Sequence, residues 1–258
     1  MNRISNCELS QGTSLVQDME TFERTSTQSS TRSTNSYHIV APLHYEKNYA
    51  YPLIVWLHEN GGSEYEIQQV MLQISMQNYV GVGVRGPIHV PNTRSFQWDE
   101  IVGGILKFHE LVIASMEAAS RRYNIARHRI FLAGFGAGAQ VAMRLALNAP
   151  QLFGGVISMG AGLPKGNTPL RHIQHARRLK MLVCYGRESQ RYPEDDVCND
   201  LRLVHTAGLK LHLRQYPCGD IATTEMFKDA DAWIMDVVTN GASSQSSSTE
   251  HVSASQWN

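Results

Sequence analysis

The sequence has no excess of charge of either sign and no long apolar run. Its 258 residues include 23 basic and 23 acidic side chains, so the formal net charge is zero. A chain without a global positive field has no electrostatic basis for binding nucleic acid or an anionic membrane surface. No stretch approaches the roughly 18 apolar residues of a membrane span, and the N-terminus lacks the apolar core of a secretory signal. We therefore expect a cytoplasmic protein with no membrane span and no nucleic-acid partner.

Cysteine is also scarce. The four cysteines, Cys7, Cys184, Cys198 and Cys218, form no C-x-x-C pair, and no H-x-x-x-H spacing accompanies the acidic residues. These absences argue against a structural zinc site and favour free buried thiols in a reducing compartment. We expect no metal and no cofactor.

Two polar segments flank the chain's apolar part. Residues 1–35 are rich in serine and threonine, and residues 239–258 are rich in serine. Neither segment has enough apolar residues to offset the entropy of folding, so both are expected to be disordered tails. The 42% apolar content of the chain is then concentrated in residues 36–238, which suit one globular domain.

Within this domain, short β-rich runs alternate with segments of helical periodicity. Strands are expected at residues 36–41, 52–58, 79–85, 129–133, 155–159, 180–185 and 209–216, and helices at residues 64–77, 99–123, 137–148, 194–206 and 223–238. Such alternation is typical of an α/β protein with a mostly parallel central sheet and helices on both faces.

The turn between the expected strand 129–133 and the following helix reads Gly134-Phe135-Gly136-Ala137-Gly138. This is the G-x-S-x-G nucleophile elbow of serine hydrolases with glycine in place of the serine. In that motif a strained backbone presents the serine hydroxyl to a general base. Strain of this kind costs about 1–3 kcal/mol for a non-glycine residue, and glycine relieves it. Gly136 can form the turn but cannot act as a nucleophile.

Three further segments occur in a recognisable order around the elbow. They are the strand Tyr51-Pro-Leu-Ile-Val-Trp-Leu-His58, the loop Gly61-Gly62, and the segment that runs from Pro150-Gln-Leu-Phe153 to Gly160-Ala-Gly-Leu-Pro164. With the elbow, they make residues 36–238 similar to the phospholipase/carboxylesterase branch of the α/β-hydrolase superfamily. The resemblance implies the α/β-hydrolase fold and an ancestral carboxylic-ester hydrolase activity.

The resemblance also assigns the catalytic positions, and none of them holds its usual residue. Gly136 aligns with the nucleophile, Ser189 with the acid and Asp220 with the basic histidine. A serine hydroxyl cannot stabilise an imidazolium as a carboxylate does. The oxyanion-hole N–H groups would come from Asn60 and Ala137. We interpret this joint replacement as a degenerate triad.

Five residues are candidates for the pocket wall: His58, Glu59, Phe96, Trp98 and Phe135. In the resembling enzymes the histidine that closes the strand supports the oxyanion loop. Glu59 would oppose a developing oxyanion if its side chain pointed inward, and it can equally point to solvent. Phe96 and Trp98 either line an apolar cleft or pack in the core, and Phe135 belongs to the elbow.

The sequence therefore favours a pseudoenzyme of the esterase type that binds a small apolar or ester-like ligand or a protein partner. One alternative is an active ester hydrolase with a non-standard site, in which the carboxylates of Glu59, Asp99, Glu188 and Asp220 converge. The other alternative is an interaction scaffold that binds no ligand and recruits partners through its tails.

Overall fold

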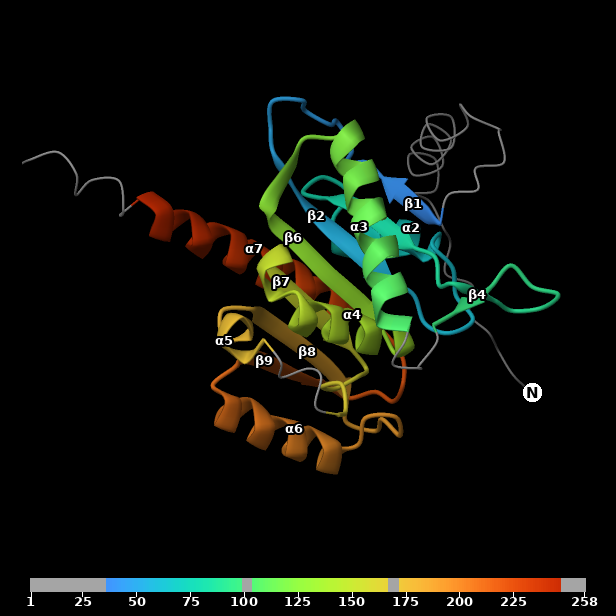
Figure 1. Cartoon of the computed structure of the whole chain (residues 1–258), viewed down its shortest axis with the longest axis vertical. Coiled ribbons are helices and arrows are strands. Elements are labelled where there is room, and N and C mark those ends of the chain that lie inside the picture. Colours follow the sequence, from blue (N-terminus) through green and yellow to red (C-terminus); the bar gives the residue numbers. More distant parts are fainter. Residues whose placement is uncertain (1–35, 99–103, 167–171, 247–258) are drawn as a thin grey trace, which may run out of the picture. The chain divides into compact units, whose positions relative to one another are not determined.

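The computed structural model describes residues 36–98, 104–166 and 172–246 (Figure 1). The expected tail at residues 1–35 and the end of the chain at residues 247–258 lie outside these ranges. The last helix continues to Ser246, so it covers residues 239–246 of the segment expected as a C-terminal tail. Residues 237–242 contain no proline, so the chain there can continue the helix.

Seven strands form one sheet in the order β1-β3-β2-β6-β7-β8-β9. β1 is antiparallel to β3, and every other neighbouring pair is parallel. This confirms the α/β-hydrolase fold class and its mostly parallel sheet. The strands are β1 (Tyr37–Val40), β2 (Tyr51–Leu57), β3 (Val80–Val84), β6 (Ile125–Phe135), β7 (Gly155–Met159), β8 (Lys180–Gly186) and β9 (Lys210–Tyr216), and a separate pair is formed by β4 (Ile88–His89) and β5 (Phe96–Gln97).

Helices connect the strands along the chain. They are α2 (Glu66–Ile74), α3 (Gly104–Arg122), α4 (Ala137–Asn148), the 3-10 turn η1 (Pro150–Leu152), α5 (Ile173–Ala176), α6 (Glu194–Ala207) and α7 (Thr224–Ser246). In Figure 1, α3 and α4 cross the near face of the sheet and α7 passes behind it. On that far face Phe227 of α7 packs against Trp56 of β2, with ring centroids 6.0 Å apart. Helices therefore cover both faces, as expected.

Burial explains why the central strands read as continuous apolar runs. Every residue of β2, β3 and β7 is buried, because each strand has a neighbour on both sides and helices above and below. The edge strand β9 instead alternates exposed and half-buried residues over most of its length. Each fully buried valine, leucine or isoleucine contributes about 1.5–3 kcal/mol, so these strands form the core of the domain.

All seven expected strands of the sheet occur within four residues of their expected bounds, and all five expected helices occur, although α7 ends eight residues later than expected. The largest difference at a strand start is in β6, which begins at Ile125 rather than residue 129. Residues 99–103, expected as the start of α3, lie outside the described ranges. The two-residue strands β4 and β5 and the four-residue α5 were missed, because elements this short have no measurable periodicity.

Two further expectations concern the surface. No helix in the described ranges has the length and apolar content needed to cross a membrane. Cys184, Cys198 and Cys218 are free thiols, but only Cys184 is buried and Cys198 is exposed. The expectation of buried thiols was therefore wrong for Cys198, which lies on the outer side of the amphipathic helix α6.

The parallel strands all end at one edge of the sheet, and the loops that follow them meet there. Glu59 follows β2, Gly136 follows β6, Gly160 follows β7, Arg191 follows β8 and Asp220 follows β9. In open α/β sheets, ligands bind outside the carboxyl ends of the strands. This edge is where a functional site is expected.

Candidate functional site

Gly136 forms the turn between β6 and α4 by itself, because β6 ends at Phe135 and α4 begins at Ala137. Its backbone has φ 53° and ψ −117°, a conformation that favours glycine. The N–H of Gly136 donates to the carbonyl of Met159 at 2.9 Å, which ties the turn to the end of β7. The turn is fixed in a conformation that would strain a non-glycine residue, and it carries no side chain.

The two outer glycines of the motif are required by close packing. A Cβ at Gly138 would overlap the carbonyl oxygen of Leu57 and lie 2.5 Å from its carbonyl carbon. A Cβ at Gly134 would lie 2.7 Å from the carbonyl carbon of Gly138. The start of α4 therefore rests directly on the ends of β2 and β6, and this contact brings the first amides of α4 to the site.

The Glu59 side chain points inward and occupies the volume above Gly136. A Cβ built on Gly136 would lie 2.5 Å from Cδ of Glu59 and closer still to its Oε2. The N–H of Ala137 donates to Oε1 of Glu59 at 3.4 Å. The carboxylate thus fills the place where a nucleophilic side chain would be, and it accepts one of the two N–H groups that the resemblance assigns to an oxyanion hole.

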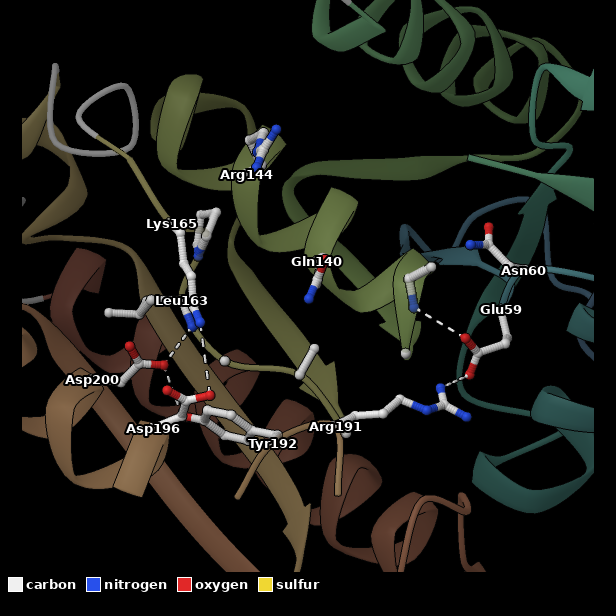
Figure 2. Close-up of a pocket in the computed structure, with 16 residues that line it drawn as sticks. Glu59, Asn60, Gln140, Arg144, Leu163, Lys165, Arg191, Tyr192, Asp196 and Asp200 are labelled. Carbon is white, nitrogen blue, oxygen red and sulfur yellow. Dashed lines mark hydrogen bonds and ion pairs between the residues drawn. The ribbon is translucent and has the colours of Figure 1, made fainter. Parts of the chain in front are cut away.

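Arg191 completes this arrangement from the loop after β8. Its guanidinium forms an ion pair with Oε2 of Glu59 (Figure 2). The guanidinium carbon also lies 5.7 Å from the ring centroid of Phe135, a cation–π contact. Arg191 is 47% exposed and Glu59 27% exposed at their side chains, so solvent reaches the pair. The charge of Glu59 is neutralised without being sealed off from water.

Ser189 and Asp220, the positions assigned to the acid and the base, contact each other. The Ser189 hydroxyl donates to Oδ1 of Asp220 at 2.5 Å, and the N–H groups of Gln190 and Arg191 also donate to this carboxylate. Burial raises the pKa of Asp220, but these three hydrogen bonds together outweigh it and lower the pKa. Asp220 is therefore an anion that holds the loop carrying Arg191.

His58 is fully buried, and both of its ring nitrogens have backbone partners. Nε2 accepts the N–H of Gly86 at 2.9 Å, so the neutral ring carries its proton on Nδ1, which donates to the carbonyl of Glu59 at 2.6 Å. Burial is the main influence that lowers the pKa of His58. With both nitrogens occupied, the ring fixes the backbone of the loop and does not face a ligand.

Asn60 and Trp98 also fix this loop. Oδ1 of Asn60 accepts the N–H of Trp98 at 2.9 Å, and the indole Nε1 of Trp98 donates to the carbonyl of His58 at 2.7 Å. Trp98 is buried and packs edge-on against Phe108. The backbone around Glu59 is thus held on both sides, and the freedom that remains is in the Glu59 side chain.

A cavity of about 400 Å³ opens beside the elbow. The first two turns of α4 form one wall, through Ala137, Gln140 and Arg144, and the segment from Gly160 to Lys165 forms another. Figure 2 shows Glu59 and Arg191 on one side of it and Lys165, Asp196 and Asp200 on the other. Six of its lining side chains are charged, so it is a polar cavity.

The acidic residues on the far side of the cavity have partners. Oδ2 of Asp200 accepts the N–H of Leu163 at 2.7 Å and the hydroxyl of Tyr192 at 2.9 Å. Burial is the main influence that raises the pKa of Asp200. Asp196 lies 3.8 Å from the ammonium of Lys165. The Arg144 guanidinium, by contrast, has no hydrogen-bond or ion-pair partner among the described residues.

Several pocket candidates from the sequence lie elsewhere. His58, Phe96, Trp98 and Phe135 do not belong to the wall that the described residues form around the cavity. Phe96 instead stacks under the guanidinium of Arg85, 4.7 Å from it. Trp98 is instead buried in the core, while Phe96 is half-buried on β5.

Three of the four carboxylates of the alternative site lie in the described ranges, and they are not grouped to hold a metal ion. Glu188 is exposed beside Arg187, and Asp99 lies outside the described ranges. Arg191 lies between Glu59 and Asp220, because it binds the first through its side chain and the second through its N–H. Within residues 36–98, 104–166 and 172–246, no three His, Cys, Asp or Glu side chains are grouped to hold a metal ion.

Sequence reasoning missed Arg191, Arg144, Lys165 and Asp200. Arg191 lies in the same loop as Ser189. The sequence identified this loop as part of the site, but it did not show that the Arg191 side chain points toward Glu59. Gln140 and Arg144 could have been found, because they follow Ala137 at helical spacing on α4. Lys165 and Asp200 have no sequence signal, since only folding brings their segments together.

The family model described as phospholipase/carboxylesterase matches residues 89–235 of the chain. No curated protein sequence matches it. Among solved structures, the carboxylesterase of Bacillus cereus superposes with a TM-score of 0.62 at 15% identity, covering 80% of this chain and 96% of that protein. The carboxylesterase of Mesorhizobium loti superposes with a TM-score of 0.59 at 17% identity, covering 71% of this chain and 88% of that protein. SOBER1 of Arabidopsis thaliana superposes with a TM-score of 0.60 at 17% identity, covering 73% of this chain and 100% of that protein.

Proposed function

The chain belongs to the phospholipase/carboxylesterase family, and from this premise we propose that it is a non-catalytic member that binds a small ligand beside its elbow. The observation that carries the proposal is the position of the Glu59 carboxylate. It fills the volume above Gly136 and takes the N–H of Ala137. A protein cannot use this space for a nucleophile and for a carboxylate at the same time.

Electrostatics support the same conclusion. Ester hydrolysis by a serine enzyme requires donors aimed at an oxygen that becomes negative in the transition state. Here the Ala137 N–H already faces an anion, and Arg191 is paired with that anion. Ser189 is poorly placed to act as a substitute nucleophile, because it is buried, its hydroxyl donates to Asp220 and its oxygen accepts the N–H of Tyr192.

The cavity supports binding over the alternative of a scaffold without a ligand. A cavity of about 400 Å³ lies within the size range of small-molecule sites, about 300–1,000 Å³, and is not filled by side chains. Its charged lining favours a polar ligand over the apolar ligand that the sequence suggested. An active hydrolase with converging carboxylates is less well supported, because Glu188 is exposed beside Arg187 and the described residues contain no group of three acidic, histidine or cysteine side chains that could hold a metal ion.

The proposal is tested by assaying the purified full chain with p-nitrophenyl acetate and butyrate and with a fluorophosphonate probe, which labels activated serines. We expect hydrolysis at the buffer rate and no labelling, since loss of a triad serine costs about 10⁶-fold in turnover in a serine protease. Hydrolysis well above buffer that Glu59→Gln or Asp220→Asn reduces would overturn the proposal.

A reconstruction tests the role of Glu59 itself. The variant Gly136→Ser/Ser189→Asp/Asp220→His restores the three assigned positions, but the new serine collides with Glu59. We expect it to remain unlabelled and to become labelled only when Glu59→Gly is added. Equal labelling of the triple and quadruple variants would contradict the assignment of Glu59 as the occupant of the nucleophile space.

A further inference from the structure

We propose that the cavity binds a small organic carboxylate, whose acid group replaces the Glu59 carboxylate between the Ala137 N–H and Arg191. This inference rests on the proposed non-catalytic binding function and adds the chemical class of the ligand. Within the protein, the Glu59 carboxylate already makes the contacts that the carboxylate of a ligand would make. One carboxylate oxygen of Glu59 accepts the Ala137 N–H, and the other pairs with Arg191 (Figure 2).

The donors around this carboxylate match a planar anion. Ala137 is the first residue of the 12-residue helix α4, where free N–H groups and the helix dipole favour negative charge. A guanidinium adds a charge-assisted contact to the second oxygen. Gly136 provides the room, since any Cβ there would exclude a carboxylate. A helix start, a cation and a glycine thus converge on one carboxylate-sized volume.

Glu59 can leave this position without unfolding the loop. The loop backbone is held by His58, Asn60 and the Gly61 N–H, which donates to the carbonyl of Phe96. Only the side chain must rotate. Its hydrogen bond from Ala137 is long, at 3.4 Å, and its ion pair is open to solvent, where such pairs contribute little. An external carboxylate can therefore compete with it.

The other residues of the cavity wall indicate which second chemical group the ligand should carry. Gln140 and Arg144 follow Ala137 along α4, and Arg144 lies about 10 Å from Ala137 along the helix axis. The Arg144 guanidinium has no partner in the described part of the chain, whereas Asp196 and Asp200 across the cavity are already bonded. A ligand with a second acceptor directed at Arg144 fits this charge pattern better than a neutral ester.

The probes are succinate and adipate, their dimethyl esters, butyrate, and inorganic phosphate, titrated calorimetrically into the full chain. We expect the dicarboxylates to bind, the dimethyl esters not to bind, and Glu59→Ala to tighten binding about tenfold by removing the internal competitor. Arg191→Gln should weaken the binding of every carboxylate probe on the order of tenfold. Arg144→Gln should weaken the binding of succinate and adipate more than the binding of butyrate.

Matched controls come from the same loop. Arg187→Gln and Glu188→Ala remove an exposed arginine and an exposed glutamate that lie outside the cavity wall, and they should leave the affinities unchanged. Circular dichroism checks the folding of each variant, and Glu59→Gln, which keeps the side-chain shape, replaces Glu59→Ala if the latter is misfolded.

The outcomes separate this inference from the proposed function. Binding of the dimethyl esters without the acids would overturn the carboxylate ligand and leave a non-catalytic binding protein. Absence of binding by any probe, even with Glu59→Ala, or phosphate binding as tight as that of succinate, would also overturn it. Release of methanol from the dimethyl esters, dependent on Asp220, would overturn the proposed function instead.

Discussion

At the scale of single residues, His58 and Glu59 are neighbours on one loop but differ in burial and in charge. The His58 ring is buried and neutral, with its nitrogens bound to the backbone of Gly86 and Glu59. The Glu59 carboxylate is partly exposed and forms an ion pair with Arg191. The loop thus uses one side chain to fix its backbone and directs the next one over Gly136.

The buried histidine predicts an acid-dependent loss of stability. Burial lowers the pKa of His58 from its ordinary value of 6.5, while the hydrogen bond to Glu59 opposes the shift. The unfolded chain therefore binds a proton more readily than the folded chain, and stability is complete above about pH 6.5 and falls as the pH drops below it. We expect the free energy of unfolding, measured with guanidinium between pH 5 and 8, to show this decline.

His58→Leu should remove that part of the pH dependence, and it should also lower stability at pH 8 by about 1–3 kcal/mol, because the Gly86 N–H loses its acceptor. The matched control is His128→Leu, which removes an exposed histidine. An unchanged pH profile in the His58 variant would mean that other groups cause the decline.

At the scale of elements, the start of α4 depends on contact with two strands. A Cβ at Gly138 would overlap the carbonyl oxygens of Leu57 and His58, which are backbone atoms and cannot rotate away. Helix propensity alone favours alanine over glycine by about 0.5–1 kcal/mol. Overpacking of this kind costs about 1–3 kcal/mol, so packing outweighs propensity.

We therefore expect Gly138→Ala to lower the free energy of unfolding, measured by guanidinium denaturation, despite its position in a helix. The control is Gly219→Ala, whose Cβ would have a single neighbour, the Glu188 carbonyl oxygen at 3.7 Å. If both substitutions had the same small effect, α4 would be free to shift away from β2, and the close contact would not define the site.

At the scale of the whole molecule, residues 36–246 contain every strand of the sheet and all the helices described here. We predict that a chain of residues 36–246 folds cooperatively, with a free energy of unfolding within about 0.5 kcal/mol of the full chain, because the described core lies within these limits. Far-ultraviolet circular dichroism during guanidinium denaturation measures it. A broad or absent transition would contradict a domain that begins at residue 36, as the sequence predicts, and ends at residue 246, where α7 ends.

The sequence by itself determined the positions of the seven strands of the sheet and of the five longer helices. An apolar run of five to seven residues is typical of a strand that is covered on both faces of a parallel sheet. It also determined the elbow, since Gly134 and Gly138 are needed for backbone contact and Gly136 for a positive φ. These features depend on local pattern, and local pattern can be read along the chain.

Only the tertiary structure decided what fills the elbow. Glu59 meets a helix start 78 residues away and an arginine 132 residues away, and it had equal reason in the sequence to face solvent. The polar cavity likewise joins α4, the loop after β7 and the start of α6. The direction of a loop side chain is set by the charges that folding places around it, and those charges come from distant parts of the chain.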